Sequence, residues 1–165
     1  MITLDGTDFR INEPQPFDKK WYSHKFNGPA LRYEVGICIQ TGHIVWCNGS
    51  YEAGSWPDRR ISLDRVVYEV DDEEMILADG GYNDDYQFFE TPTGENTVEQ
   101  KMKKDARARH ETINRRFKTW NILKQSYRHS LDKHWMVFAA VSNITQLMIE
   151  TEEDYIFQVE YNDAE

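Results

Sequence analysis

Two aspartates, each followed by a glycine in an apolar segment, are the residues best suited to chemistry. Asp5 stands in LDGT and Asp79 in ADGGY. A glycine beside a carboxylate lets the backbone approach a ligand closely, and two carboxylates delivered by two strands can bind a divalent cation. Taken alone, each aspartate is better explained as a turn residue, because Asp-Gly is among the commonest turn dipeptides. Together they predict a metal site at the ends of two strands.

Glu111 is the third candidate, and its place on a predicted helix determines its surroundings. It shares a helical row with Arg107, Asn114, Arg115 and Lys118, whereas the apolar residues of the segment follow another face. One interpretation is a metal ligand whose cationic neighbours contact phosphates, with Asn114 hydrogen-bonding to a ligand. The other is an i,i+4 ion pair with Arg115, which contributes only about 0.5 kcal/mol.

The charge distribution favours a polyanionic partner for this helix. The 165 residues carry a net charge of −10, yet residues 99–133 hold eleven basic and four acidic residues, a net +7, which leaves −17 for the rest. A basic stripe on an acidic body is typical of local contact with nucleic acid. A solvated helix face is the simpler alternative.

These side chains require a mixed α/β framework to bring them together. Periodicity and turn chemistry predict strands at 2–11, 31–40, 43–49 and 75–82, a long loop at 12–29, and helices at 58–70, 97–127 and 134–150. Asn96 is the expected N-cap of the longest helix, with Glu99 completing a capping box. Residues 150–165 form an acidic tail. Nothing separates two domains, so residues 1–165 are expected to fold as one.

Composition excludes several other classes of protein. With 39% hydrophobic residues the chain is globular, and it contains neither the roughly eighteen consecutive apolar residues of a membrane span nor a signal peptide at its start. We therefore expect an intracellular protein without membrane contact. Cys38 and Cys47 are predicted to lie diagonally across a hairpin, too far apart for an easy disulfide. The five histidines are scattered, so a zinc site is not expected.

Four motifs occur together in a known order. LDGTDFRI, GSWPD, ADGGY and HETINRRFKTWNILKQSYRH resemble, in this order, the catalytic domain of DDE-superfamily transposases of the Harbinger type. The resemblance covers nearly the whole chain. The 31 residues between Asp79 and Glu111 are close to the usual spacing of the second and third acids in that family.

The resemblance implies a ribonuclease H-like fold, with a five-stranded mixed β-sheet flanked by helices. It implies that Asp5, Asp79 and Glu111 are the catalytic triad and bind two Mg²⁺ or Mn²⁺ ions, which support phosphodiester cleavage and strand transfer in nuclear DNA. Asp8 is a rival to Asp5, but it is expected to face the other side of its strand. Gly54, Ser55 and Asp58 match a supporting GS-x-x-D motif. The residues expected to contact DNA phosphates are Lys25, Arg107, Arg115, Lys118 and Lys124.

Two other functions stay open at this point. The chain starts on the first catalytic strand, whereas transposases of this kind carry further N-terminal sequence that reads DNA, so it is expected to be a fragment or a decayed copy. A decayed or domesticated domain would act as a non-catalytic DNA- or protein-binding module. An active one would depend on a homo-oligomer or on a separate DNA-binding region or protein. A third possibility is an unrelated acidic interaction domain, in which the three acids would lie far apart.

Overall fold

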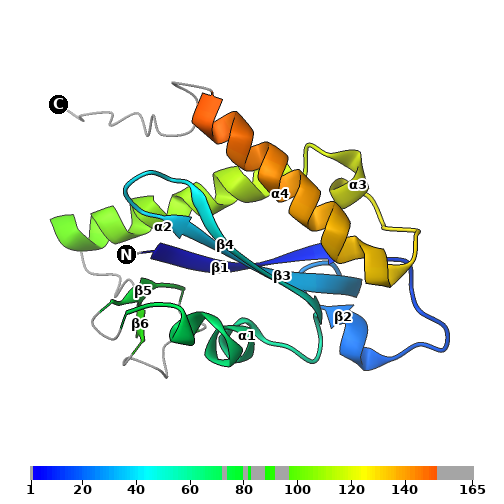
Figure 1. Ribbon diagram of the computed structural model, residues 1–165. Coiled ribbons are helices and arrows are strands. Elements are labelled where there is room, and N and C mark those ends of the chain that lie inside the picture. The colour runs from blue at the N-terminus through cyan, green and yellow to red at the C-terminus, as the bar shows by residue number, and fades with distance from the viewer. Residues whose placement is uncertain (1, 72–73, 80–81, 83–87, 92–96, 152–165) are drawn as a thin grey trace.

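A mixed sheet forms the centre of the computed structural model, which describes residues 2–71, 74–79, 82, 88–91 and 97–151 (Figure 1). The strands are β1 (Ile2–Arg10), β2 (Tyr22–Ser23), β3 (Gly28–Cys38), β4 (Ile44–Glu52), β5 (Ile76–Leu77) and β6 (Phe89–Glu90). Their order is β2-β3-β1-β5-β6, and β4 also pairs with β3. β3 is antiparallel to β1 and β4, whereas β1, β5 and β6 are parallel to one another. The predicted α/β fold with a mixed sheet between helices is confirmed.

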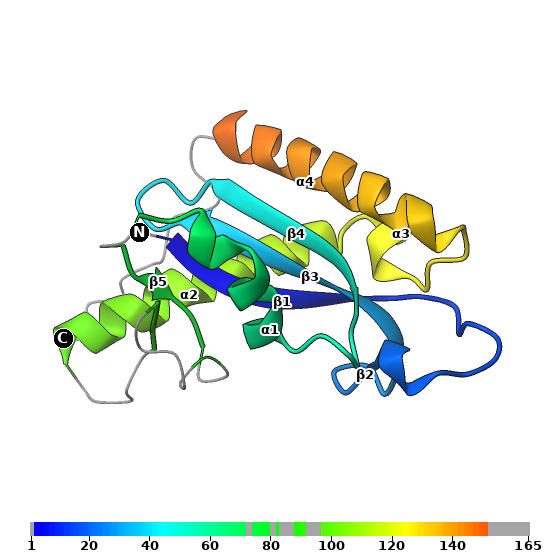
Figure 2. The ribbon, with the colours of Figure 1, turned by 60° about the horizontal axis from the view of Figure 1, so that its bottom comes forward.

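Helices cover both faces of this sheet. They are α1 (Asp58–Asp64), α2 (Val98–Phe117), α3 (Asn121–Lys124) and α4 (His134–Thr151), with 3-10 turns η1 (Lys19–Trp21), η2 (Val66–Tyr68) and η4 (Leu131–Lys133). Figures 1 and 2 show α2 and α4 on one face and α1 on the other. None of the helices in the described ranges is both long and apolar enough to cross a membrane.

Alternation along β1 sends its side chains to two separate cores. Phe9 packs beneath α2 and α4, against Tyr33, Phe117 and Phe138. Leu4 packs on the opposite face, in a cluster that also holds residues of η2, β5 and β6. Because neighbouring side chains of a strand point to opposite faces, the odd-numbered residues of β1 face α2 and the even-numbered ones face α1. Asp5 and Asp8 therefore lie on different faces, as predicted.

The single helix predicted over 97–127 is wrong in length. α2 ends at Phe117, and the backbone of Trp120 is extended before α3 begins. The apolar spacing continues across this break because Leu123 and Tyr127 are buried in the same core as Phe117. The N-cap is Thr97, whose Oγ1 accepts a hydrogen bond from the Gln100 amide (3.2 Å). The predicted cap Asn96 and the side chain of Glu99 lie outside the described residues.

The segment predicted as a loop at 12–29 contains ordered strands. Tyr22 and Ser23 of β2 pair with Pro29 and Gly28, so β3 begins three residues before the predicted strand. Pro29 is tolerated because its carbonyl still accepts a hydrogen bond, from the Ile11 amide (3.2 Å). With the two-residue strands β2 and β6, the sheet has six strands rather than the five implied by the resemblance.

Two predicted segments are only partly described. In the strand predicted at 75–82, the structure assigns strand only to Ile76–Leu77, and Gly80 and Gly81 lie outside the described residues. α4 runs to Thr151, one residue beyond the predicted helix end, and the remaining acidic tail, 152–165, is outside the described ranges. Cys38 and Cys47 are both free thiols.

Candidate catalytic centre

The register of β1 and β5 sets the two aspartates level with each other. These strands are parallel, with Ile2 opposite Ile76 and Thr3 opposite Leu77. Continued for two residues, this register puts Asp79 opposite Asp5. Residues at the same level of a parallel pair project to the same face. Both carboxylates therefore belong on the α2 side of the sheet, although 73 residues separate them in the chain.

α2 presents polar side chains to both aspartates. The Asn114 amide donates a hydrogen bond to Asp5 Oδ2 (3.4 Å), and Arg107 Nη2 lies 3.8 Å from Asp79 Oδ2. Arg107 and Asn114 are two of the residues predicted to share a helical row with Glu111. The row therefore faces the strand ends, as the metal-ligand interpretation of Glu111 requires.

An open hollow of about 300 Å³ lies between α2 and the strand that carries Asp5. Its lining consists of Asp5, Lys104, Arg107, Ala108, His110 and Glu111. Glu111 is solvent-exposed, so its carboxylate is accessible at the rim. His110 is only 4% exposed, and burial lowers its pKa to about 4, so it is neutral at physiological pH. His110 is a packing residue and not a phosphate-binding cation.

A bound cation would reduce the electrostatic cost of keeping Asp5 ionised. Burial raises the pKa of Asp5, and the negative charges of Asp58 and Asp79 raise it further, although Lys25 and Arg107 oppose them. Carboxylate oxygens are the ligands that Mg²⁺ prefers. The chemistry of the donors thus fits a hard divalent cation. Within the described ranges, however, no three acidic, histidine or cysteine side chains are grouped closely enough to hold a metal ion as they stand.

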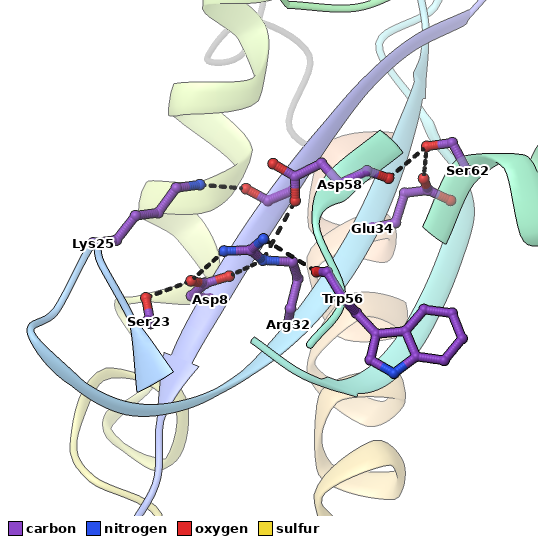
Figure 3. Close-up of polar contacts among 9 residues, drawn as sticks. Asp8, Ser23, Lys25, Arg32, Glu34, Trp56, Asp58 and Ser62 are labelled. Atoms are coloured by element: carbon purple, nitrogen blue, oxygen red, sulfur yellow. Dashed lines mark hydrogen bonds and ion pairs between the residues drawn. The ribbon is translucent and has the colours of Figure 1, made fainter. Parts of the chain in front are cut away.

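A buried ion-pair network lies on the opposite face of β1, beneath the predicted site (Figure 3). Arg32 binds Asp8 through two contacts, Nε to Oδ1 (2.7 Å) and Nη2 to Oδ2 (3.0 Å), and Ser23 Oγ donates to Asp8 Oδ2 (2.6 Å). The Asp8 side chain is completely buried. Although burial acts against it, the hydrogen bonds from Arg32 and Ser23 hold the pKa of Asp8 below its usual value. Asp8 is thus a structural ion-pair partner rather than a rival to Asp5.

Arg32 also joins this network to the GS-x-x-D motif. Its Nε lies 3.3 Å from Asp58 Oδ1, and its Nη1 donates to the Trp56 carbonyl (3.2 Å). The Asp58 carboxylate packs directly on Gly6, where a side chain of any size would collide with it. The glycine after Asp5 is therefore required by the close approach of Asp58 and not only by a ligand. No sequence pattern pointed to Arg32, and the GS-x-x-D match predicted only a supporting role for Asp58.

Glu34 is a buried acid that connects this network to α1. It pairs with Gly6 across the β1–β3 ladder and is only 1% exposed. Its carboxyl group accepts hydrogen bonds from Trp46 Nε1 (2.8 Å) and from Ser62 Oγ, and Ser62 also donates to the Asp58 carbonyl (3.1 Å). Burial is the main reason that the pKa of Glu34 rises to about 7.

Glu34→Gln is expected to change the pH dependence of stability. A raised pKa means that the folded state holds a proton which the unfolded state releases near pH 4.5, so wild-type stability falls as the pH rises from 4.5 to 7. Glutamine imitates the protonated acid and abolishes this loss. The difference in unfolding free energy between variant and wild type should grow by about 3 kcal/mol from pH 4 to pH 8 in urea titrations. Parallel stability curves would contradict the burial of an acid with a raised pKa.

The cations predicted to bind DNA fall into two groups. Arg107 borders the hollow, and Lys25 donates a hydrogen bond to the carbonyl of Gly6 (2.8 Å), so both lie beside Asp5. Lys118, the C-cap of α2, has its Nζ 5.9 Å from the ring centroid of Phe26. Arg115 is exposed on α2. Lys124 is exposed on α3 and not on the single long helix predicted over 97–127.

One of the comparisons with known proteins identifies a family for the chain. The family described as DDE superfamily endonuclease matches residues 4–146, which include Asp5, Asp79 and Glu111. No curated protein and no solved structure matches the chain.

Proposed function

The chain belongs to the DDE superfamily endonuclease family, and we propose that it is the catalytic core of a metal-dependent DNA endonuclease or transposase. Its ribonuclease H-like α/β fold is that of the family. The proposal is carried by the parallel register of β1 and β5 at Ile2–Ile76 and Thr3–Leu77, which, continued two residues beyond the end of β5, sets Asp79 level with Asp5. Glu111, at the hollow that Asp5 also lines, supplies the third acid.

In this proposal Asp5, Asp79 and Glu111 bind Mg²⁺ or Mn²⁺. Two such ions would supply Lewis-acid activation of the attacking water or 3′-hydroxyl and neutralisation of charge at the leaving oxygen. Asn114 fixes the orientation of the Asp5 carboxylate through its hydrogen bond. Arg107, which lies close to Asp79 and lines the hollow, is well placed to turn to a phosphate there.

The DNA strand in this proposal follows the basic side of α2. The phosphates are contacted from three elements. The α2 helix and its C-cap supply Arg107, Arg115 and Lys118, the β2–β3 turn supplies Lys25, and α3 supplies Lys124. These contacts neutralise charge without reading sequence. A homo-oligomer or a separate DNA-binding region would supply target recognition, and the substrate implies a nuclear location.

The second candidate is a domain that keeps the fold but binds DNA or protein without cutting. It is favoured by the ion contact of Arg107 with Asp79 and by the absence of a ready metal cluster within the described ranges. The two candidates differ in whether the carboxylates bind a metal ion at all.

Metal-induced thermal stabilisation tests this difference. A ligand present at about 100 times its dissociation constant stabilises the folded state by about 2.7 kcal/mol. For a domain of this size we expect Mg²⁺ or Mn²⁺ to raise the melting temperature by about 5 °C or more, relative to EDTA at equal ionic strength. The Asp79→Asn variant should lose most of the shift. Equal melting temperatures of the wild type with metal and with EDTA would favour the non-catalytic module.

A further inference from the structure

Lys25 occupies an unusual position, at the open edge of the strand that carries Asp5. β5 pairs with β1 only at Ile2 and Thr3, and in the described ranges no strand continues along that edge beside Gly6. There Lys25 Nζ donates a hydrogen bond to the Gly6 carbonyl (2.8 Å). Figure 3 shows the Lys25 side chain extending from the β2–β3 turn toward β1, where Nζ makes this hydrogen bond. Its ammonium group therefore sits between the face that carries Asp5 and the face that carries Asp58.

The ammonium of Lys25 acts on acids of both faces. Gly6, whose carbonyl accepts the Lys25 hydrogen bond, directly follows Asp5 in β1. The Asp58 carboxylate packs on the same glycine, so the positive charge of Lys25 lies beside both acids. The Arg32 guanidinium is paired with both Asp8 and Asp58, with Nε 2.7 Å from Asp8 Oδ1 and 3.3 Å from Asp58 Oδ1. Lys25, in contrast, is exposed, and its ammonium group donates a hydrogen bond to a backbone carbonyl, that of Gly6.

The turn that bears Lys25 is anchored independently of that side chain. Ser23 Oγ donates to the buried Asp8 carboxylate (2.6 Å), and the Phe26 amide donates to the Ser23 carbonyl (3.3 Å). The Phe26 ring lies near two further cations, with the Arg10 guanidinium 4.7 Å and Lys118 Nζ 5.9 Å from its centroid. A lysine released from Gly6 would thus join two other cations on a fixed support, an arrangement suited to a phosphate.

We propose that Lys25 is the counter-ion of the acidic centre formed by Asp5 and Asp58. A divalent cation displaces Lys25 from this position, and Lys25 then binds a DNA phosphate beside Arg10 and Lys118. The proposal rests on the proposed function, because it needs a metal ion at Asp5. Metal binding and strand binding are then coupled through one side chain. If Lys25 only held the turn against β1, it would stabilise the fold and would not weaken metal binding.

The variant Lys25→Met separates these roles, because methionine keeps much of the length and apolar character of lysine without its charge. Mn²⁺ affinity is measured on the full chain by isothermal titration calorimetry at fixed ionic strength. Removal of one competing unit charge from the neighbourhood of a divalent ion should tighten Mn²⁺ binding by about three- to tenfold. Lys25→Arg, which keeps the charge, should stay near the wild-type value. Lys19→Met, an equal charge change at an exposed lysine of η1, is the matched control.

DNA binding supplies the second measurement. The affinity for a labelled duplex is measured by fluorescence anisotropy with Ca²⁺ and with EDTA, over a range of salt concentrations. Lys25→Met should weaken binding mainly with Ca²⁺, where its salt dependence should fall by about one phosphate contact. With EDTA the loss should be small, because Lys25 is then engaged at Gly6.

The outcomes distinguish this inference from the proposed function. A wild-type protein that binds no Mn²⁺ would overturn both. A wild-type protein that binds Mn²⁺, with unchanged or weaker binding by Lys25→Met, would overturn the counter-ion role alone. If Lys25→Met lost equal DNA affinity with Ca²⁺ and with EDTA, the proposal that metal binding moves Lys25 from the acidic centre to a DNA phosphate would be overturned. Circular dichroism and a melting curve establish that each variant is folded.

Discussion

Asp79→Ala is expected to abolish metal-dependent nicking of supercoiled plasmid, with a loss of at least about 100-fold, since even residues that only support a metal ligand contribute 10- to 100-fold. Asp79 is partly exposed, two residues after the end of β5, and the register of β1 and β5, continued to this point, sets it level with Asp5. Its removal takes away a proposed ligand without emptying a core position. Nicking is followed on agarose gels with Mg²⁺ or Mn²⁺ over enzyme concentrations that resolve a 100-fold difference.

A matched control uses an acid outside the proposed site. Asp64→Asn removes one negative charge from an exposed residue at the end of α1 and should leave nicking near the wild-type rate. Asp79→Asn keeps the shape of the side chain and should be as inactive as the alanine variant, because the charge binds the metal. If Asp79→Ala nicks as fast as the wild type while Asp5→Ala does not, the assignment of the second acid is wrong. Nicking by neither the wild type nor Asp64→Asn would instead favour the non-catalytic module.

Arg32→Met is expected to destabilise the fold by about 3–5 kcal/mol, the usual loss when one member of a buried ion pair is removed. The reason is that Asp8 is completely buried and that Arg32 supplies its positive charge through two hydrogen bonds. Methionine leaves that carboxylate charged and without its cation. Urea or thermal unfolding at pH 7 gives the change in unfolding free energy.

Two further variants identify the cause of this loss. Arg65→Met removes an exposed arginine just after α1 and should change the stability by no more than about 0.5 kcal/mol. In the double variant Arg32→Met with Asp8→Asn, no buried charge is left unpaired at this pair, so the loss should be smaller than the sum of the two single losses. Additive losses would show that Arg32 stabilises the protein by packing and not through Asp8.

The buried charges around Arg32 fix the position of the strand that carries Asp5. Arg32 joins β1 through Asp8 to α1 through Asp58, and Glu34 joins the same helix through Ser62. The strand that delivers Asp5 is thereby fixed against α1 on one side, while α2 supplies Asn114 on the other. A carboxylate held from both faces retains its position when a divalent cation approaches, and this favours catalysis by metal ions.

Local patterns in the sequence determined much of this protein. The strands β1, β3 and β4 and the helix that begins at His134 follow from periodicities of 2 and 3.6, which record the face of an element that meets the core. The helix predicted over 58–70 is shorter, because α1 ends at Asp64 and a 3-10 turn follows at Val66–Tyr68. The same periodicity placed Glu111 beside Arg107 and Asn114, and the structure turns that row toward the strand ends. The periodicity did not reveal the break after Phe117, because α3 buries its residues in the same core.

Only the tertiary structure decided which distant residues meet. Asp8 pairs with Arg32, 24 positions away, because the antiparallel register of β1 and β3 sets them opposite each other. Asp5 and Asp79 become level through the parallel register of β1 and β5, and Lys25 reaches Gly6 because β5 leaves that edge of β1 open. Register depends on the packing of whole elements and not on the residues of one segment. The sequence alone therefore indicated the acids and several nearby cations, while Arg32 and the contacts of Lys25 and Arg107 with the acidic centre emerged only from the fold.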